Sequence, residues 1–325
     1  MRRLRWQSVP TKKGTLSGIL NAEISRLDFT YEHFLPDLRA ADTLLLGSDY
    51  SGEASSAPCL VYSFLLTSLE PWANWEPARL GIRKQFLSDS RRMSFKRLTD
   101  GQRRRALPHL LTAANSLDGL SLSVAFNKRS ESVFEARPPL DLSNPQFAAF
   151  RKWKTDVLEK AFFICHVLGV LLAGLAVPGQ NVLWFTDEDS ITANDDRVRE
   201  LTQLFAWISS QYLTFTLGHC GCGTSRCDNG SRQIEDLLAI PDLISGALAE
   251  QLALKVTDPS DLAEVLWIHR GDFSDKTKTI TWWFSDSGSP LRRVVFIVDP
   301  ARDGNGLMLS SFHFFDQKTE PDKAR

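Results

Sequence analysis

Short apolar runs bounded by turn residues predict most of the strands of this chain. One such run ends at Asp49, and a polar turn separates it from a second run that begins at Cys59. Runs of roughly four to eight apolar residues between turn signals are typical of buried strands. We therefore expect strands at 43–49, 59–67, 93–98, 120–126, 181–186 and 213–217.

Apolar residues at helical spacing predict helices between these strands, whereas the first forty residues carry no clear pattern. The expected helices are 100–115, 144–177, 196–212 and 233–254. Pro241, inside the last of them, predicts a fresh first turn and so places Asp242 near a helix start. The alternation of strands and helices predicts an α/β fold with a mixed sheet flanked by helices.

The pattern changes after residue 255. Two β-rich runs, 277–284 and 292–298, flank a turn rich in Ser and Gly, which predicts a hairpin, and 308–315 is a candidate third strand. The 325 residues accordingly divide into a basic N-terminal arm (1–42), an α/β domain (43–255) and a C-terminal β-hairpin extension (256–325).

Composition places the chain among ordinary globular proteins, with 43% hydrophobic and 24% charged residues. The 38 basic and 39 acidic residues give a net charge of −1, so any nucleic acid must be held by a local patch. Such a patch is present between Arg91 and Arg105, where the only acid is Asp100. The sequence leaves open whether this patch holds phosphates or is a solvated helix face.

Cysteine content and apolar runs bear on location. Five cysteines are too few for a disulfide scaffold, and their odd number favours a reducing, cytoplasmic compartment. No apolar stretch follows the basic N-terminus before Leu20, so we expect no signal peptide. The apolar run 161–177 is shorter than the roughly 20 residues of a spanning helix, and it predicts a buried core helix and no membrane partner.

A dense group of soft ligands occurs in a glycine-rich segment: His219, Cys220, Cys222 and Cys227. One imidazole and three thiols suit tetrahedral Zn²⁺, which would stiffen the segment before Asp242. The spacing is not that of paired Cys-x-x-Cys knuckles, so a flexible loop or a reactive thiol remains the alternative.

Three aspartates stand where sheet topology can bring them together. Asp49 ends the first strand, Asp187 ends a later strand, and Asp242 opens a helix. Oxygen ligands of this kind suit Mg²⁺ or Mn²⁺, and Glu188 is a weaker fourth candidate ligand. Taken singly, each aspartate also has an ordinary interpretation as a turn or cap residue.

Three segments carry a family resemblance: Ser48-Asp-Tyr-Ser-Gly52, Phe185-Thr-Asp-Glu-Asp189, and the helix from Asp236 to Ala247. In this order they resemble a large, poorly characterised bacterial family with an RNase H-like fold, over roughly residues 44–250. The resemblance implies an RNase H-like mixed sheet and a divalent-metal site at the positions of Asp49, Asp187 and Asp242.

The chain departs from that family at two positions. Tyr50 stands where the family usually has Glu, and Ser94-Phe-Lys96 stands where it has Glu-x-Lys. We expect a nuclease or phosphodiesterase that hydrolyses nucleic acid at a Mg²⁺ or Mn²⁺ site, with Lys96 among its catalytic residues. The arginines expected to hold the nucleic acid are Arg91, Arg92, Arg97, Arg103 and Arg104. The alternative is a catalytically degenerate module that binds nucleic acid or a protein. Whether the substrate is RNA, DNA or a small nucleotide stays open.

Overall fold

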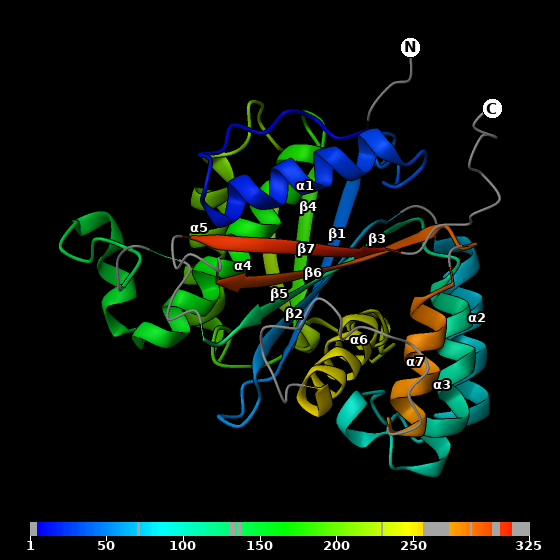
Figure 1. Cartoon of the computed structure of the whole chain (residues 1–325). Helices are drawn as coiled ribbons and strands as arrows, with labels where there is room; N and C mark the ends of the chain where they lie inside the picture. Colours follow the sequence, from blue (N-terminus) through cyan, green and yellow to red (C-terminus); the bar gives the residue numbers. More distant parts are fainter. Residues whose placement is uncertain are drawn as a thin grey trace, which may run out of the picture.

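The computed structural model describes residues 5–69, 72–129, 134, 138–228, 230–255, 273–286, 288–300 and 306–313. Within these residues a seven-stranded mixed sheet has the order β5-β4-β1-β2-β3-β6-β7 (Figure 1). The strands are β1 (Thr43–Ser51), β2 (Cys59–Ser68), β3 (Gly119–Asn127), β4 (Asn181–Thr186), β5 (Cys220–Thr224), β6 (Leu291–Pro300) and β7 (Leu307–His313). The predicted α/β class with a mixed sheet is confirmed.

The central strand β1 pairs with its two neighbours in opposite orientations. It runs antiparallel to β2 and parallel to β4. The β2–β3 and β6–β7 pairs are antiparallel, whereas β4–β5 and β3–β6 are parallel. Strands covered on both faces bury side chains of both alternations, which explains why β1, β2 and β3 read as continuous apolar runs.

Helices cover both faces of the sheet (Figure 1). One core joins the sheet to α1, α4 and α5, and the other joins it to α2, α3, α6 and α7. The helices are α1 (Leu16–Thr30), α2 (Trp72–Phe86), α3 (Gly101–Ala114), α4 (Thr155–Leu175), α5 (Asp195–Ser210), α6 (Gln233–Lys255) and α7 (Asp275–Phe284). We call the two sides of the sheet the α4 face and the α6 face.

Most elements predicted between residues 43 and 255 are confirmed. The strands at 43–49, 59–67, 120–126 and 181–186 and the helices at 100–115, 196–212 and 233–254 are present within a few residues of the expected bounds. The expected helix 144–177 is divided, because a 3₁₀ segment, η2 (Pro145–Lys152), precedes α4 and the extended Trp153 separates them.

Four sequence predictions about local structure are wrong. Residues 93–98 form a loop with one 3₁₀ turn, η1 (Phe95–Arg97), and 213–217 form no strand. The first forty residues are not irregular, since they contain α1, which contacts α4 and β7. The segment 277–284 is helix α7 rather than half of a hairpin, and the side chain of Ser274 caps it by accepting a hydrogen bond from the N–H of Thr277.

The C-terminal strands belong to the central sheet. β6 pairs with β3 along its length, and β7 pairs with β6. The predicted strand 308–315 corresponds to β7 as far as His313, and residues 314–315 lie outside the described residues.

Helix α4 is the described helix that is long and apolar enough to cross a membrane by length and composition alone. Its most apolar window is 78% buried inside the protein, where it packs beneath the sheet. A buried core helix passes the same test of length and composition, so this property is weak evidence for a membrane span.

Candidate active site

A cavity of about 260 Å³ opens where β1 and β4 end, between α6 and the loop that contains η1. Asp49, Asp187 and Asp242, the three aspartates singled out in the sequence, all line it. The cavity also takes in Glu188 and the predicted cations Lys96, Arg92 and Arg97. The structure thus brings most of the sequence-predicted site residues to one place.

Strand register brings Asp49 and Asp187 together. Ser48 of β1 pairs with Thr186 of β4 in the parallel ladder, so Asp49 and Asp187 are the next residues on two adjacent strands. Alternation along β1 turns Asp49 toward α6, where the Oγ of Ser245 donates a hydrogen bond of 2.8 Å to its carboxylate. Asp49 therefore faces the helix that carries the third aspartate.

Asp242 lies within α6, not at a helix start as expected. The helix continues through Pro241, whose ring lies near Gly47 of β1, a position without a side chain. Asp242 and Ser245 are three residues apart and share one face of the helix. The backbone N–H of Phe95 in η1 donates a hydrogen bond of 2.6 Å to the carboxylate of Asp242. The η1 segment, expected as a strand, is thereby held against the site.

Burial and mutual repulsion raise the pKa values of two of these carboxyls. Burial raises the pKa of Asp49 well above its usual range, and the neighbouring Asp242 raises it further. Burial and the charge of Asp187 raise the pKa of Asp242 to about 6, against the opposing hydrogen bond from Phe95. Among the described residues no Lys, Arg or His forms an ion pair with Asp49 or Asp242. Two buried acids therefore lie together without a directly bonded counter-charge.

Asp187 is arranged differently, because a guanidinium already neutralises it. Its Oδ1 accepts a hydrogen bond of 2.7 Å from Nη2 of Arg92, and its side chain is 41% exposed. The Oγ1 of Thr192 donates to its backbone carbonyl (2.9 Å), which fixes the turn after β4. The side chain of Asp187 is thus tied to the η1 loop across the mouth of the cavity.

The donor chemistry of this cavity suits a hard divalent cation. Its ligands are carboxylate oxygens, the type that Mg²⁺ and Mn²⁺ prefer. Among the described residues, however, no three His, Cys, Asp or Glu side chains are gathered as a ready metal-binding group. Asp49 and Asp242 fit a cation by chemistry and charge, whereas Asp187 would have to exchange Arg92 for the ion.

A further cation of the cavity, Lys160, escaped the sequence reasoning. Lys160, on α4, forms ion pairs with Glu53 (2.5 Å) and Asp189 (2.6 Å), and its Nζ lies 4.5 Å above the ring of Tyr50. Glu235, two turns before Asp242 on α6, is only 8% exposed and also lines the cavity. A single lysine at the polar start of a long apolar helix is the signal that would have pointed to Lys160.

Tyr50 occupies the position where the resembled family carries Glu, and it turns away from Asp49. Its hydroxyl lies 2.7 Å from Oγ of Ser48 and 3.2 Å from Oγ1 of Thr186, on the α4 face of the sheet. Burial raises the pKa of Tyr50 well above its usual range. Tyr50 therefore supplies a neutral, hydrogen-bonded wall. Glu188, the weaker fourth candidate, is 45% exposed and pairs with Arg226 at 3.3 Å.

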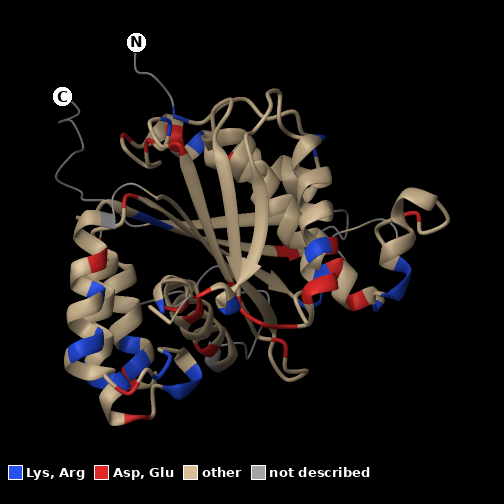
Figure 2. Ribbon diagram, turned by 180° about the vertical axis from the view of Figure 1, so that it is seen from behind, with Lys and Arg blue, Asp and Glu red and all other residues tan. Residues whose placement is uncertain are grey.

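The basic residues between 91 and 105 divide into two groups. Lys96 and Arg97 are exposed and line the cavity, and Arg104 is exposed on α3. Arg103 is buried and its Nε donates to the backbone carbonyl of Arg92, whereas Arg91 pairs with two aspartates, Asp89 and Asp100. Figure 2 shows blue residues gathered at one end of the α2–α3 lobe. The exposed cations are the ones available to phosphates.

The four predicted zinc ligands are not gathered. Cys220 and Cys222 alternate onto one side of β5 and pack against the α4-face core, whereas His219 and Cys227 are exposed. Burial raises the pKa of the Cys220 thiol to about 11, which disfavours the thiolate that binds zinc. No metal-binding group of three His, Cys, Asp or Glu occurs in the described part of the chain. The segment expected as a loop is instead the edge strand β5.

Comparison with protein-family models, with curated proteins and with solved structures finds no match to this chain.

Proposed function

We propose that the chain is a metal-dependent nuclease of RNase H-like fold that hydrolyses phosphodiester bonds at the cavity of Asp49, Asp187 and Asp242. The observation that carries the proposal is the convergence of these three aspartates from β1, the end of β4 and α6. They belong to the three segments that resemble the family, and those segments are about 50 to 140 residues apart in the sequence. Their meeting in one cavity is what a shared catalytic role requires.

Electrostatics supports a bound cation. Burial raises the pKa values of Asp49 and Asp242, and a neighbouring carboxylate raises each further: Asp242 for Asp49, and Asp187 for Asp242. Either protons or a divalent cation relieve this repulsion, and a cation relieves it for both groups at once. Asp49 and Asp242 would hold the ion, with the carboxylate of Asp187 beside them in its ion pair with Arg92. Bound there, Mg²⁺ or Mn²⁺ would supply Lewis-acid stabilisation of the charge that develops on the phosphoryl oxygens.

The chain's own side chains supply orientation. Ser245 fixes the rotation of the Asp49 carboxylate, and the N–H of Phe95 fixes that of Asp242. Lys96 and Arg97 stand exposed at the cavity, where they can bind the phosphates that flank the scissile bond. A substrate held by these two side chains would place a phosphate against the carboxylates.

Cleavage assays test the proposal. Purified protein is incubated with labelled single- and double-stranded DNA and RNA plus Mn²⁺ or Mg²⁺, beside the variants Asp49→Asn and Asp242→Asn. We expect cleavage by the wild type and at least a hundredfold loss in each variant. The matched control is Asp196→Asn, an exposed carboxylate on α5 outside the cavity. Cleavage that survives both substitutions would overturn the assignment of the site.

Two observations favour the alternative, a degenerate module that binds nucleic acid without cleaving it. Tyr50 replaces the family's Glu with a neutral phenol, and Arg92 neutralises Asp187. This alternative predicts binding without cleavage on every substrate, together with weaker binding in Lys96→Ala and Arg97→Ala. Binding measured in the same reactions by electrophoretic mobility shift separates the two functions.

A further inference from the structure

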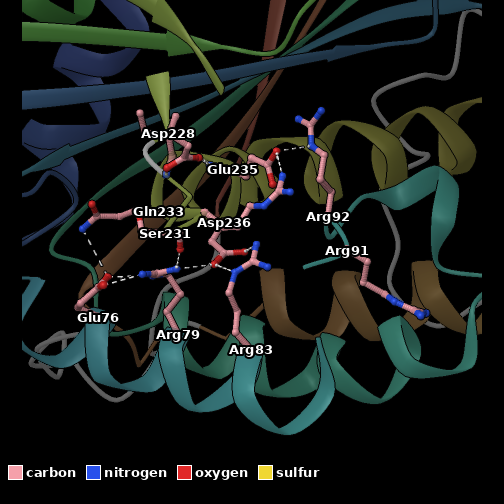
Figure 3. Close-up of polar contacts among 12 residues, drawn as sticks. Glu76, Arg79, Arg83, Arg91, Arg92, Asp228, Ser231, Gln233, Glu235 and Asp236 are labelled. Atoms are coloured by element: carbon pink, nitrogen blue, oxygen red, sulfur yellow. Dashed lines mark hydrogen bonds and ion pairs between the residues drawn. The ribbon is translucent and has the colours of Figure 1, made fainter. Parts of the chain in front are cut away.

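Arg92 lies between two acidic groups of the cavity rather than at its outer rim. Its Nη2 is 2.7 Å from Oδ1 of Asp187. Its Nε is 3.4 Å from Oε1 of Glu235 (Figure 3). The Nε of Arg103 donates 2.7 Å to the backbone carbonyl of Arg92, which anchors the segment that carries it. The guanidinium is therefore held in place from its backbone and from both carboxylates.

Glu235 has one satisfied oxygen and one spare oxygen. Its Oε1 accepts a hydrogen bond of 2.5 Å from Nη1 of Arg232. Its Oε2 is buried and has no hydrogen-bond partner, although the residue lines the cavity. A buried carboxylate oxygen without a donor is costly, so this atom is open to a further donor if the charges around it change.

The first turn of α6 keeps Glu235 at this position. The carboxylate of Asp228 accepts the backbone N–H groups of Ile234 (3.0 Å) and Glu235 (2.9 Å). Next to it, Asp236 accepts hydrogen bonds from Arg79 (3.0 Å) and Arg83 (2.6 Å) of α2 (Figure 3). These hydrogen bonds hold the first turn of α6 in place. Glu235 therefore stays at the cavity when Arg92 is replaced.

We infer that Arg92 is a resident cation of this site: it neutralises Asp187 and, together with Arg232, Glu235, so that the chain binds one divalent cation and not two. The inference rests on the proposed function and deepens it. The guanidinium carries a permanent charge and bonds in the plane of a carboxylate, so it serves Asp187 and Glu235 without dissociating. The pair Asp49 and Asp242, which has no such partner, is left as the place of the exchangeable ion. Arg92 is accordingly a positioning residue and not a phosphate-binding residue.

Titration of the metal-free full chain with Mn²⁺ by isothermal titration calorimetry tests this inference. We expect one Mn²⁺ per chain for the wild type and for Arg92→Lys, which keeps the charge. We expect two per chain for Arg92→Gln, because Asp187 then loses its counter-charge and lies near the spare oxygen of Glu235, whose other oxygen stays paired with Arg232. The double variant Arg92→Gln, Glu235→Gln should return to one.

The neighbouring Arg91→Gln is the matched control, since Arg91 is also doubly ion-paired but does not line the cavity. It should bind one Mn²⁺. If Arg92→Gln does not fold by circular dichroism, Arg92→Met replaces it with a side chain of similar volume. One Mn²⁺ in the charge-removing variant, or two in the wild type, overturns the inference and leaves the proposed function standing. No Mn²⁺ at millimolar concentration in the wild type overturns the proposed function itself.

Discussion

The two faces of the sheet bury very different side chains. On the α4 face, α4 is buried almost continuously from Ala161 to Leu175, and its one titratable imidazole, His166, lies 2.5 Å from the hydroxyl of Tyr212. On the α6 face the buried groups include Asp49, Asp236 and Arg79. The α4 face buries apolar area, which stabilises the fold, whereas the α6 face carries charges whose desolvation costs stability.

The difference shows where this fold can place chemistry. The apolar stretch of the α4 face holds the strands in position, and the charge that α4 brings to the cavity is limited to Lys160 near its start. The α6 face offers such charge because α2 and η1 bring arginines and backbone donors to the acids of α6. Every residue that we assign to divalent-cation binding lies at the strand ends or on α6, and the predictions below test this division.

Replacing Asp236, a buried acid of the α6 face, should have the largest effect on stability. Asp236→Asn removes the carboxylate that Arg79, which is 1% exposed, and Arg83 share. Arg79 keeps its ion pair with Glu76, whereas Arg83 loses the carboxylate that it contacts. Breaking a buried ion pair from one side costs about 3–5 kcal/mol. We expect the free energy of unfolding in urea to fall by that amount.

The control is Asp196→Asn, which breaks the exposed pair with Arg199 on α5. It should leave the urea midpoint nearly unchanged, because exposed pairs contribute little. Equal midpoints for Asp236→Asn and Asp196→Asn would contradict the proposed contrast between the faces.

Removing a site carboxylate should act in the opposite direction. The pKa of Asp242 is raised to about 6, so the folded state binds more protons than the unfolded state between about pH 4 and 6. Stability therefore falls as pH rises through this window and stays lower above it. Asp242→Asn should raise the free energy of unfolding at pH 8 by about 2–3 kcal/mol in the presence of a chelator.

Added Mn²⁺ should stabilise the wild type at pH 8 and have less effect on Asp242→Asn, because the variant lacks one of the two acids that attract the ion. A variant less stable than the wild type at pH 8 would show that Asp242 is a structural residue.

The imidazole of the α4 face should respond to pH with the reverse sign. Burial lowers the pKa of His166 to about 4, so the unfolded state binds more protons between about pH 6.5 and 4. This contribution to stability is complete above that window and is lost as the pH falls. Relative to His166→Gln, the wild type should lose about 1–2 kcal/mol between pH 7 and pH 5. Parallel pH profiles of the two proteins in urea unfolding would contradict this origin of the acid sensitivity.

Two glycines allow a matched test of packing on the two faces. A Cβ at Gly246 of α6 would lie 2.3 Å from the ring of Phe95, and one at Gly174 of α4 would lie 2.3 Å from the ring of Trp6. Each Gly→Ala change should cost about 1 kcal/mol of stability. Only Gly246→Ala should also weaken Mn²⁺ binding, since Phe95 holds Asp242 through its N–H. Equal metal affinity in both variants would show that η1 does not position the acid.

The central strands were predicted well from the sequence. Because β1, β2 and β3 are covered on both faces, nearly all of their positions are buried and their sequences are uninterrupted apolar runs. It failed where tertiary contacts override local preference. The Thr- and Trp-rich segment 277–284 favours a strand by propensity, yet Ser274 caps it as α7 and Trp283 packs on the α6-face core. β5, made largely of Gly and Cys, has no strand pattern, and it forms by backbone pairing with β4.

The positions of Asp49 and Asp187 were predictable because strand ends on a shared edge must meet, and the register now places them side by side. Asp242 was identified correctly as a cavity residue but for the wrong reason, since α6 runs through Pro241. The partners of the acids, Arg92 and Ser245, were beyond the reach of the sequence as such. Their roles depend on a loop and a helix that approach the strands from distant parts of the chain.

The order in which the strands are made has a consequence for synthesis. β3 is buried at all nine of its positions, and in the finished fold β6 protects its outer edge. More than 160 residues are translated between β3 and β6, so a nascent chain displays an apolar, unpaired edge during much of its emergence from the ribosome. A chain that ends before residue 291 would keep that edge permanently, and self-association through β3 is its expected fate.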